Sequence, residues 1–197
     1  MSPVARKTHC TLSGSLHNES PVPSRGACLR LLSDHDVPQV IRRHSEVVAR
    51  LSRQVALDLG STEDCTVDPG LLEAAGLLHD IAKDSAGDVL EDHASAGAEL
   101  LRGLGLEAVA ELVERHIDLG DWYSSGGVEP AEILFYCDKR VRHDSVVSLD
   151  ERFHDLLERY ASEGPSAETQ IRSAWESALR LEVKIFSRLD YPPEALR

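Results

Sequence analysis

Histidine and aspartate side chains interrupt the apolar faces of several predicted helices. The pair His79 and Asp80 stands within "LLHDIAKD", among Leu, Ala and Ile neighbours. Similar interruptions recur at His44, His93, His116 and Asp138. Burying such groups costs free energy unless a hydrogen bond, an ion pair or a metal ion satisfies them. Because imidazole nitrogens and carboxylate oxygens are common metal ligands, the six residues together predict a metal centre.

The alternative for any one of these histidines is an ordinary core residue that is hydrogen-bonded to a neighbour. Asp138 is harder to explain in that way, because a buried carboxylate is costly unless it is paired or binds a metal. Since adjacent helix positions point about 100° apart, Asp80 is placed beside His79 where it can bridge two ions. Lys83 shares a helix face with Asp80. Lys83 is expected either to bind an anion such as phosphate or to be a solvated lysine in the last turn of the helix. Asp84 is expected either to support a metal ligand without contacting the metal or to be part of the following turn.

The elements that must position these residues are helices. Apolar residues recur at helical spacing along the chain, and no stretch alternates as a strand does. In the long stretch 38–59, for example, His44 lies on the same face as Val40 and Val47. The sequence therefore predicts an all-α fold, a single-domain helical bundle with helices at 27–33, 38–59, 69–83, 92–104, 106–119, 129–143, 149–161 and 166–189.

Length and composition predict one domain. The chain has 197 residues, of which 42% are hydrophobic, so it is long enough to bury a sizeable core. Residues 1–25 are rich in Ser and Pro and are expected to form a flexible tail, with a transit peptide as the alternative. The domain is expected to span 26–190, with the metal site within about 38–142 and the C-terminal helices within 149–189.

The net charge, the lack of long apolar runs and the cysteine pattern limit the partners and the compartment that we expect. The net charge of −13 argues against a nucleic-acid duplex, because affinity for a phosphate backbone rests on Lys and Arg. A small phosphorylated substrate held through a bound cation remains compatible with that charge. No apolar run approaches a membrane span, so no membrane partner is expected. We interpret the cysteines as free thiols of a cytoplasmic protein, since no CxxC pair occurs among Cys10, Cys28, Cys65 and Cys137.

Three segments resemble the H…HD…D signature of the HD superfamily of metal-dependent phosphohydrolases: "RRHSEVV", "LLHDIAKD" and "FYCDKRV". The resemblance implies an all-helical fold of the HD-domain type, with core metal ligands at His44, His79, Asp80 and Asp138. Two further segments, "EDHASAGAELL" with His93 and "VERHIDL" with His116, match the extra histidines of superfamily members that bind two metals. The resemblance therefore implies the six-ligand, dinuclear branch.

That branch includes symmetrical diadenosine tetraphosphate hydrolases and cyclic-dinucleotide phosphodiesterases. No GYP triplet follows the signature, which argues against the second group. The segment "IDLGDWYSSGG" differs from the Thr-Gly segment expected in the first group. The stretch "CDKRVRHDSVVSLDERF" resembles small bacterial HD proteins that are sometimes joined to a nucleotidyltransferase domain.

The function expected from these observations is metal-dependent phosphohydrolysis of a small nucleotide-like or other phosphorylated substrate. A metal-activated water would cleave a phosphoester or phosphoanhydride bond. Two divalent ions are expected, chosen among Mn, Fe, Co, Ni, Mg and Zn, with Asp80 and Lys83 as catalytic residues. Arg140 or Arg142 could add to phosphate binding, although "KRVR" is also typical of a solvated face, and Cys137 is expected to be a packing residue.

Three alternatives remain open from the sequence. Some HD-superfamily proteins with the same ligand types hold a di-iron centre and act as oxygenases. A diadenosine tetraphosphate hydrolase-like enzyme is the second alternative. In the third, the apolar stripe of the last helix, which includes Trp175, is a partner surface that forms a homodimer, whereas the simpler interpretation is that it closes the bundle core.

Overall fold

A computed structural model describes residues 21–60, 67–83, 92–120, 126–160, 162 and 164–197. Much of the predicted tail, the thiols of Cys10 and Cys65, and Asp84 lie outside these residues. The elements in chain order are α1 (Arg25–Asp34), α2 (Gln39–Leu59), α3 (Pro69–Leu78), α4 (Asp92–Gly103), α5 (Glu107–Glu114), α6 (Pro130–Lys139), β1 (Val141–Arg142), β2 (Ser145–Val146), α7 (Leu149–Tyr160), α8 (Pro165–Phe186) and the short 3₁₀ helix η2 (Pro193–Ala195). The prediction of an all-α fold is confirmed.

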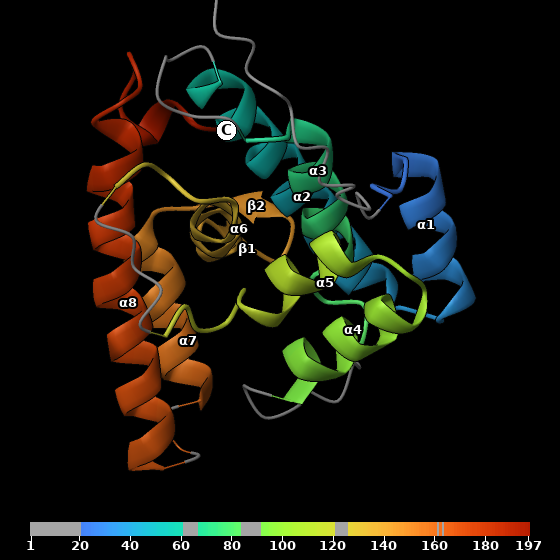
Figure 1. The fold of residues 1–197 in the computed structure, drawn as a ribbon. Helices are drawn as coiled ribbons and strands as arrows, with labels where there is room; N and C mark the ends of the chain where they lie inside the picture. The colour runs from blue at the N-terminus through green and yellow to red at the C-terminus, as the bar shows by residue number, and fades with distance from the viewer. Residues whose placement is uncertain (1–20, 61–66, 84–91, 121–125, 161, 163) are drawn as a thin grey trace, which may run out of the picture.

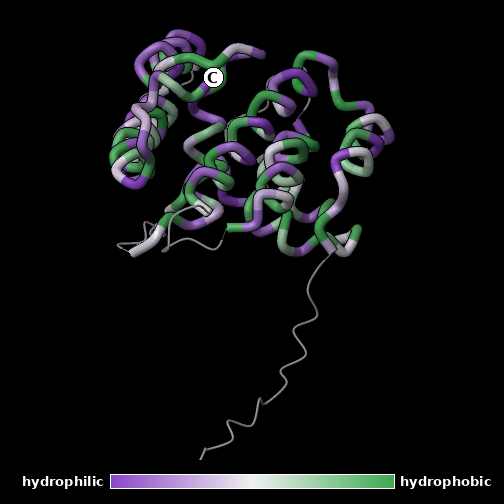
Figure 2. The backbone as a smooth tube through the Cα atoms, turned by 90° about the horizontal axis from the view of Figure 1, so that it is seen from above, coloured by the Kyte–Doolittle hydropathy of each residue, from purple (hydrophilic) through white to green (hydrophobic). Residues whose placement is uncertain are grey.

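Helix α6 lies at the centre of the molecule. The pair α7 and α8 packs on one side of it, whereas α2, α3 and α5 pack on the other, with α1 outside α3 (Figure 1). Hydrophobic and hydrophilic residues alternate along the turns of the helices, as the tube in Figure 2 shows. Each helix thereby turns an apolar face inward.

A close approach of α2 and α3 brings two of the site's segments together. Gly76 of α3 faces Ala49 of α2, and a Cβ on this glycine would lie only 2.5 Å from the Ala49 Cα. Only glycine permits this spacing, because any larger residue would push the helices apart. Asp68 caps the start of α3 by accepting a hydrogen bond from the Gly70 N–H at 2.8 Å, and Pro69 follows as the first helical residue.

The predicted helices 69–83 and 106–119 both end about five residues earlier than expected. The stretch 69–83 leaves the α-helix after Leu78, where the Ile81 N–H donates to the Leu78 carbonyl and the Lys83 N–H to the Asp80 carbonyl. These three-residue spacings tighten the chain into a 3₁₀-like turn. The stretch 106–119 leaves the helix after Glu114, again through such bonds.

The absence of strands and the helix 129–143 were wrong predictions. Helix α6 ends at Lys139, and β1 pairs antiparallel with β2 in a two-residue ladder. His143 lies in the intervening turn with a φ of 57°. This left-handed conformation stops any helix from continuing and turns the chain back toward α2. Among the described residues, no helix combines the length and apolarity needed to cross a bilayer.

Candidate metal centre

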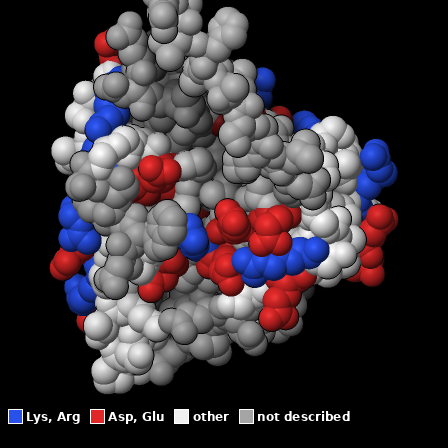
Figure 3. Space-filling model, in the orientation of Figure 1, with Lys and Arg blue, Asp and Glu red and all other residues white. Residues whose placement is uncertain are grey.

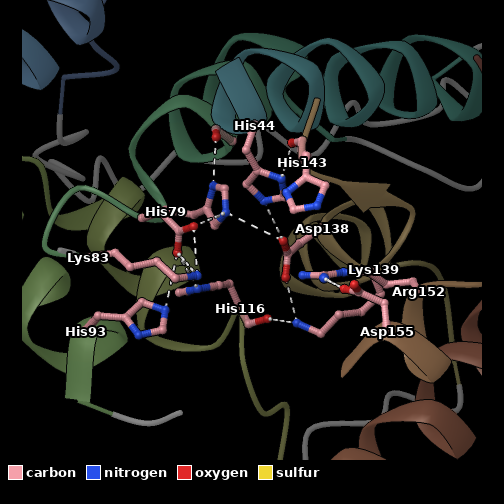
Figure 4. A network of polar contacts seen from close by, with 12 residues as sticks. His44, His79, Lys83, His93, His116, Asp138, Lys139, His143, Arg152 and Asp155 are labelled. Atoms are coloured by element: carbon pink, nitrogen blue, oxygen red, sulfur yellow. Dashed lines mark hydrogen bonds and ion pairs between the residues drawn. The ribbon is translucent and has the colours of Figure 1, made fainter. Parts of the chain in front are cut away.

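The six predicted ligands converge in one buried cluster from five segments of the chain (Figure 4). One histidine comes from each of α2 and α4, the adjacent pair from the turn after α3, one from just beyond α5, and an aspartate from α6. Each residue is at most 7% exposed: His44, His79, Asp80, His93, His116 and Asp138. The histidine rings stand in a row, with centroids 4.9 to 5.3 Å apart.

Backbone carbonyls fix the orientation of three of the histidine rings. The Nδ1 atom of His44 lies 3.0 Å from the His143 carbonyl, and that of His79 lies 2.9 Å from the Gly76 carbonyl. For His116 the carbonyl of Val113 lies 2.6 Å away. Because a carbonyl only accepts, each Nδ1 carries the proton and donates it. The Nε2 atoms of these rings therefore point into the cluster, as in many metal sites with a carbonyl behind the ligand.

The two carboxylates lie between the histidines. Oδ1 of Asp138 is 3.0 Å from His44 Nε2 and 3.6 Å from His79 Nε2. Asp80 spans the cluster, since its Oδ2 lies 3.4 Å from His79 Nε2 and its Oδ1 lies 3.2 Å from His93 Nε2 and 3.5 Å from His116 Nε2. Each oxygen of Asp80 thus faces a different part of the cluster.

Burial and mutual charge set the protonation of the cluster in the chain alone. Burial lowers the pKa of His116 to about 4 and also lowers that of His44. Burial acts on His79 in the same direction, but the negative charges of Asp80 and Asp138 outweigh it and raise the His79 pKa to about 10. Burial raises the pKa of each carboxyl, yet the neighbouring cationic groups hold both well below their usual range. The chain alone thus keeps a cation, the His79 imidazolium, between two carboxylates.

The donor set fits divalent metal ions. Among the described residues, Nε2 of His79 and both ring nitrogens of His93 are buried without a hydrogen-bond partner. Two groups of three side chains have their ligand atoms close enough to share an ion, namely His44, His79 and Asp138, and His79, Asp80 and His116. Buried nitrogen atoms without hydrogen-bond partners are costly unless a cation satisfies them.

Two lysines border the cluster. Lys83 places its Nζ 3.1 Å and 3.3 Å from the two Asp80 oxygens, so it lies on the side that the sequence predicted. Lys139 was missed by the sequence analysis. Its buried Nζ donates to Asp138 Oδ2 at 2.7 Å and to the His116 carbonyl at 3.0 Å, which holds these two residues together.

The arginines proposed for phosphate binding lie elsewhere. Arg140 is buried, and its Nε donates to the Val147 carbonyl at 2.7 Å while its Nη1 donates to the Tyr136 hydroxyl at 2.6 Å. Arg142 belongs to β1. Neither residue borders the cavity beside the cluster. Arg140 therefore ties α6 to the hairpin instead of facing the cluster. Cys137 is fully buried in the core, where burial raises the pKa of its thiol to about 12.

A cavity of about 220 Å³ opens beside the cluster. The predicted ligands His93, His116 and Asp138 form part of its wall together with both lysines. The wall continues along α7 and α8 and includes Arg152, which the sequence analysis also missed. No local pattern marked this arginine, because only the packing of α7 against α6 brings it near the cluster. The cluster is therefore accessible to a small molecule from the side of the basic residues.

Comparison with known families agrees with this arrangement. A family model of the HD domain matches residues 41–191, and the protein belongs to the HD domain family. HD domains bind divalent metals, and proteins of this family are generally hydrolases.

Two curated proteins are similar over 149 residues each. A tRNA (cytidine(56)-2'-O)-methyltransferase of Picrophilus torridus is 29% identical over 71% of this chain and 41% of its own length. Ribonuclease Y of Thermus thermophilus is 30% identical over 74% of this chain and 25% of its own length. The chain thus spans less than half the length of either relative. No solved structure matches the chain.

Proposed function

We propose that the protein is a metal-dependent phosphohydrolase that cleaves a phosphoester or phosphoanhydride bond of a small phosphorylated substrate. The observation that carries this proposal is a buried cluster of metal-ligand side chains that borders, on its accessible side, a cavity lined by cationic groups. The similarity to a ribonuclease, a phosphodiester-cleaving enzyme by its name, supports phosphoester hydrolysis.

The ligand geometry favours two ions. His44, His79 and Asp138 would hold one, and His93 with His116 would hold the other. Asp80 would bridge them, because its two oxygens face different sides of the cluster. Bound divalent ions supply Lewis acidity and make a water nucleophile available near neutral pH.

The remaining groups of the site act on the substrate and on the ligands. The carbonyls behind the three histidine rings keep the Nε2 atoms aimed inward, so the ligands need no reorganisation. Lys83 borders the cavity, where its ammonium group would offset the negative charge that develops on a transferred phosphoryl group. The charges of Asp80 and Asp138 outweigh burial and raise the Lys83 pKa, so this lysine stays protonated.

The surface of the protein favours a small substrate over a duplex. Acidic side chains gather over α4 and α5 on the face in Figure 3, and the chain carries a net charge of −13. A polyphosphate backbone would be repelled by such a surface. The small number of cations in the cavity suits one phosphorylated molecule, which we expect the enzyme to meet in the cytoplasm.

Phosphate release tests the proposal. The metal-loaded protein is incubated with nucleotides, dinucleoside polyphosphates, sugar phosphates and p-nitrophenyl phosphate, and the double variant His79→Ala, Asp80→Ala serves as the blank. Asp144→Asn, a change at an exposed carboxylate, is the matched control and should keep wild-type activity. Release that persists in the blank would contradict the proposal. Iron content and an electron paramagnetic resonance signal of a half-reduced pair would instead indicate the di-iron oxygenase.

A further inference from the structure

The cavity extends well beyond the metal ligands. Its far part lies between α6, α7 and α8, where the wall is formed by apolar side chains such as Phe135, Phe153, Leu156, Ile171 and Ala174. Phe153 stacks on Trp175 with ring centroids 5.5 Å apart and an interplanar angle of 5°, which fixes the wall. Metal chemistry on a phosphate needs no apolar surface of this kind, so this part of the cavity calls for a separate explanation.

Arg152 of α7 stands between the metal end and the apolar end. Its side chain is 11% exposed, and its Nη1 donates to Asp155 Oδ2 at 3.2 Å. Its Nε is buried and has no hydrogen-bond partner within the part of the chain that the structure describes. In Figure 4 the side chain points from α7 toward the cluster. An unsatisfied guanidinium N–H at a cavity wall is costly unless a ligand accepts from it.

The charges at this point favour an anion. Arg152 and Lys83 both border the cavity, and their positive charges act on each other. The carboxylate next to Lys83 belongs to the metal cluster, and the one next to Arg152 is shared with Arg159. A phosphoryl group between Arg152 and Lys83 would satisfy the free N–H and relieve the repulsion. Guanidinium groups bind phosphate oxygens through short, charge-assisted hydrogen bonds.

We propose that Arg152 binds the phosphoryl group of a phosphate ester through its Nε–H, and that the apolar part of the cavity between α7 and α8 holds the ester's organic group. The cavity volume of about 220 Å³ lies below the range of about 300–1,000 Å³ for pockets of drug-sized ligands. The organic group is therefore compact and apolar or aromatic. This inference rests on the proposed phosphohydrolase function and deepens it by naming the substrate class.

Binding measured separately from turnover tests the proposal. Inorganic phosphate and phenyl phosphate are titrated into the manganese-loaded protein by calorimetry, and the release of phosphate from phenyl phosphate is followed in a separate assay. Arg152→Gln should weaken the binding of both probes by roughly 10- to 100-fold, because a charged hydrogen bond is lost, and Arg152→Lys should recover part of the loss. Arg172→Gln, at an exposed arginine of α8, is the matched control and should leave both affinities unchanged.

The apolar part is tested with the same two probes. Phenyl phosphate should bind the wild type roughly tenfold more tightly than inorganic phosphate, because its ring leaves water. Ala174→Phe should abolish this preference by filling the space, while the affinity for inorganic phosphate stays unchanged. Melting curves identify variants that do not fold. If Arg152→Gln does not fold, Arg152→Met is used instead, and if Ala174→Phe does not fold, Ser177→Phe is used instead.

The outcomes separate this inference from the proposed function. Unchanged phosphate affinity in the folded Arg152 variants, or no preference for phenyl phosphate in the wild type, would overturn the inference even if phosphate is released from other substrates. Arg152-dependent binding together with the phenyl preference would support it. If no substrate then yields phosphate, the proposed hydrolysis fails while the binding assignment stands.

Discussion

Helix α6 borders buried charged groups on two faces, and the hydrogen bonds of the chain are complete at only one of them. On the face toward α8, Lys184 places its Nζ 2.7 Å from both Glu132 oxygens, and the Tyr136 hydroxyl donates to Glu182 at 2.7 Å. On the face toward α2 and α3, Asp138 joins a cluster in which His79 and His93 keep buried nitrogens without hydrogen-bond partners among the described residues.

The difference separates a structural role from a functional one. Buried polar groups in folded proteins are normally hydrogen-bonded, and exceptions call for an explanation. The Glu132–Lys184 pair needs nothing from outside the chain, so it fixes α8 against α6. The histidine–aspartate cluster leaves buried nitrogens that a cation would satisfy. Buried charge alone does not indicate a functional site. A set of buried polar side chains that face one another and lack hydrogen-bond partners does indicate one.

The largest effect is expected for Asp80→Asn. This change removes the charge proposed to bridge the ions. Mutations of residues that only support metal ligands already lower metal affinity or activity by roughly 10- to 100-fold. We therefore expect phosphate release to fall by roughly 100-fold or more, with less metal bound per chain. Phosphate release and elemental analysis measure the two effects. Wild-type activity in this variant would show that Asp80 is not a metal ligand.

The matched change at the Glu132–Lys184 pair, on the face of α6 that points away from the cluster, is Glu132→Gln. It removes the same kind of charge, but it leaves Lys184 buried without its ion pair. Breaking a buried pair costs about 3–5 kcal/mol of unfolding free energy. We expect urea unfolding to show a loss of this size while metal content and specific activity of the folded protein stay at wild-type values. A loss of metal would mean that the two faces are coupled.

A smaller effect is expected for Gly76→Ala. The added Cβ would meet the Ala49 backbone at 2.5 Å, and such overpacking costs about 1–3 kcal/mol. Because Gly76 also presents its carbonyl to the His79 ring, metal affinity should fall together with stability. Gly103→Ala is the control, since a Cβ there meets nothing within 4 Å. Thermal melts with and without manganese measure both quantities. Unchanged metal affinity in Gly76→Ala would show that helix spacing does not position the ligands.

The smallest effect is a pH dependence of metal affinity. The His79 pKa is raised to about 10, so its Nε2 is protonated at neutral pH and a metal must displace that proton. The pKa values of His44 and His116 are lowered, so these ligands are already neutral. Affinity should therefore rise with pH, by roughly tenfold per unit between about pH 7 and 8.5. Manganese titrations in buffers of different ionisation enthalpy count the proton released on binding. A manganese affinity that does not change with pH would contradict this prediction.

The sequence was informative where a polar residue occupied a position that the helical pattern of apolar residues assigns to the core. The six proposed ligands stood out because histidine and aspartate occupied apolar helix positions, and the structure brings all of them into one cluster. Lys83 was placed beside Asp80 by helical spacing, and it lies there although the chain forms a 3₁₀-like turn at that point. Their roles as ligands and as a catalytic residue remain predictions.

The parts that the sequence did not show depend on which helices meet. The end of α6 was missed because the left-handed residue His143 has no pattern of its own. Lys139, Arg152 and the Glu132–Lys184 pair looked like ordinary helical charges. Their roles arise only when α6, α7 and α8 pack against one another.

The metal content of the protein tests the central claim most directly. The wild-type chain is purified after growth with manganese, iron and zinc, and its metals are measured by elemental analysis before and after treatment with a chelator. We expect two divalent ions per chain, lost on chelation and absent from the His79→Ala, Asp80→Ala variant. A wild-type chain that binds no metal, or a variant that keeps the full complement, would contradict the account.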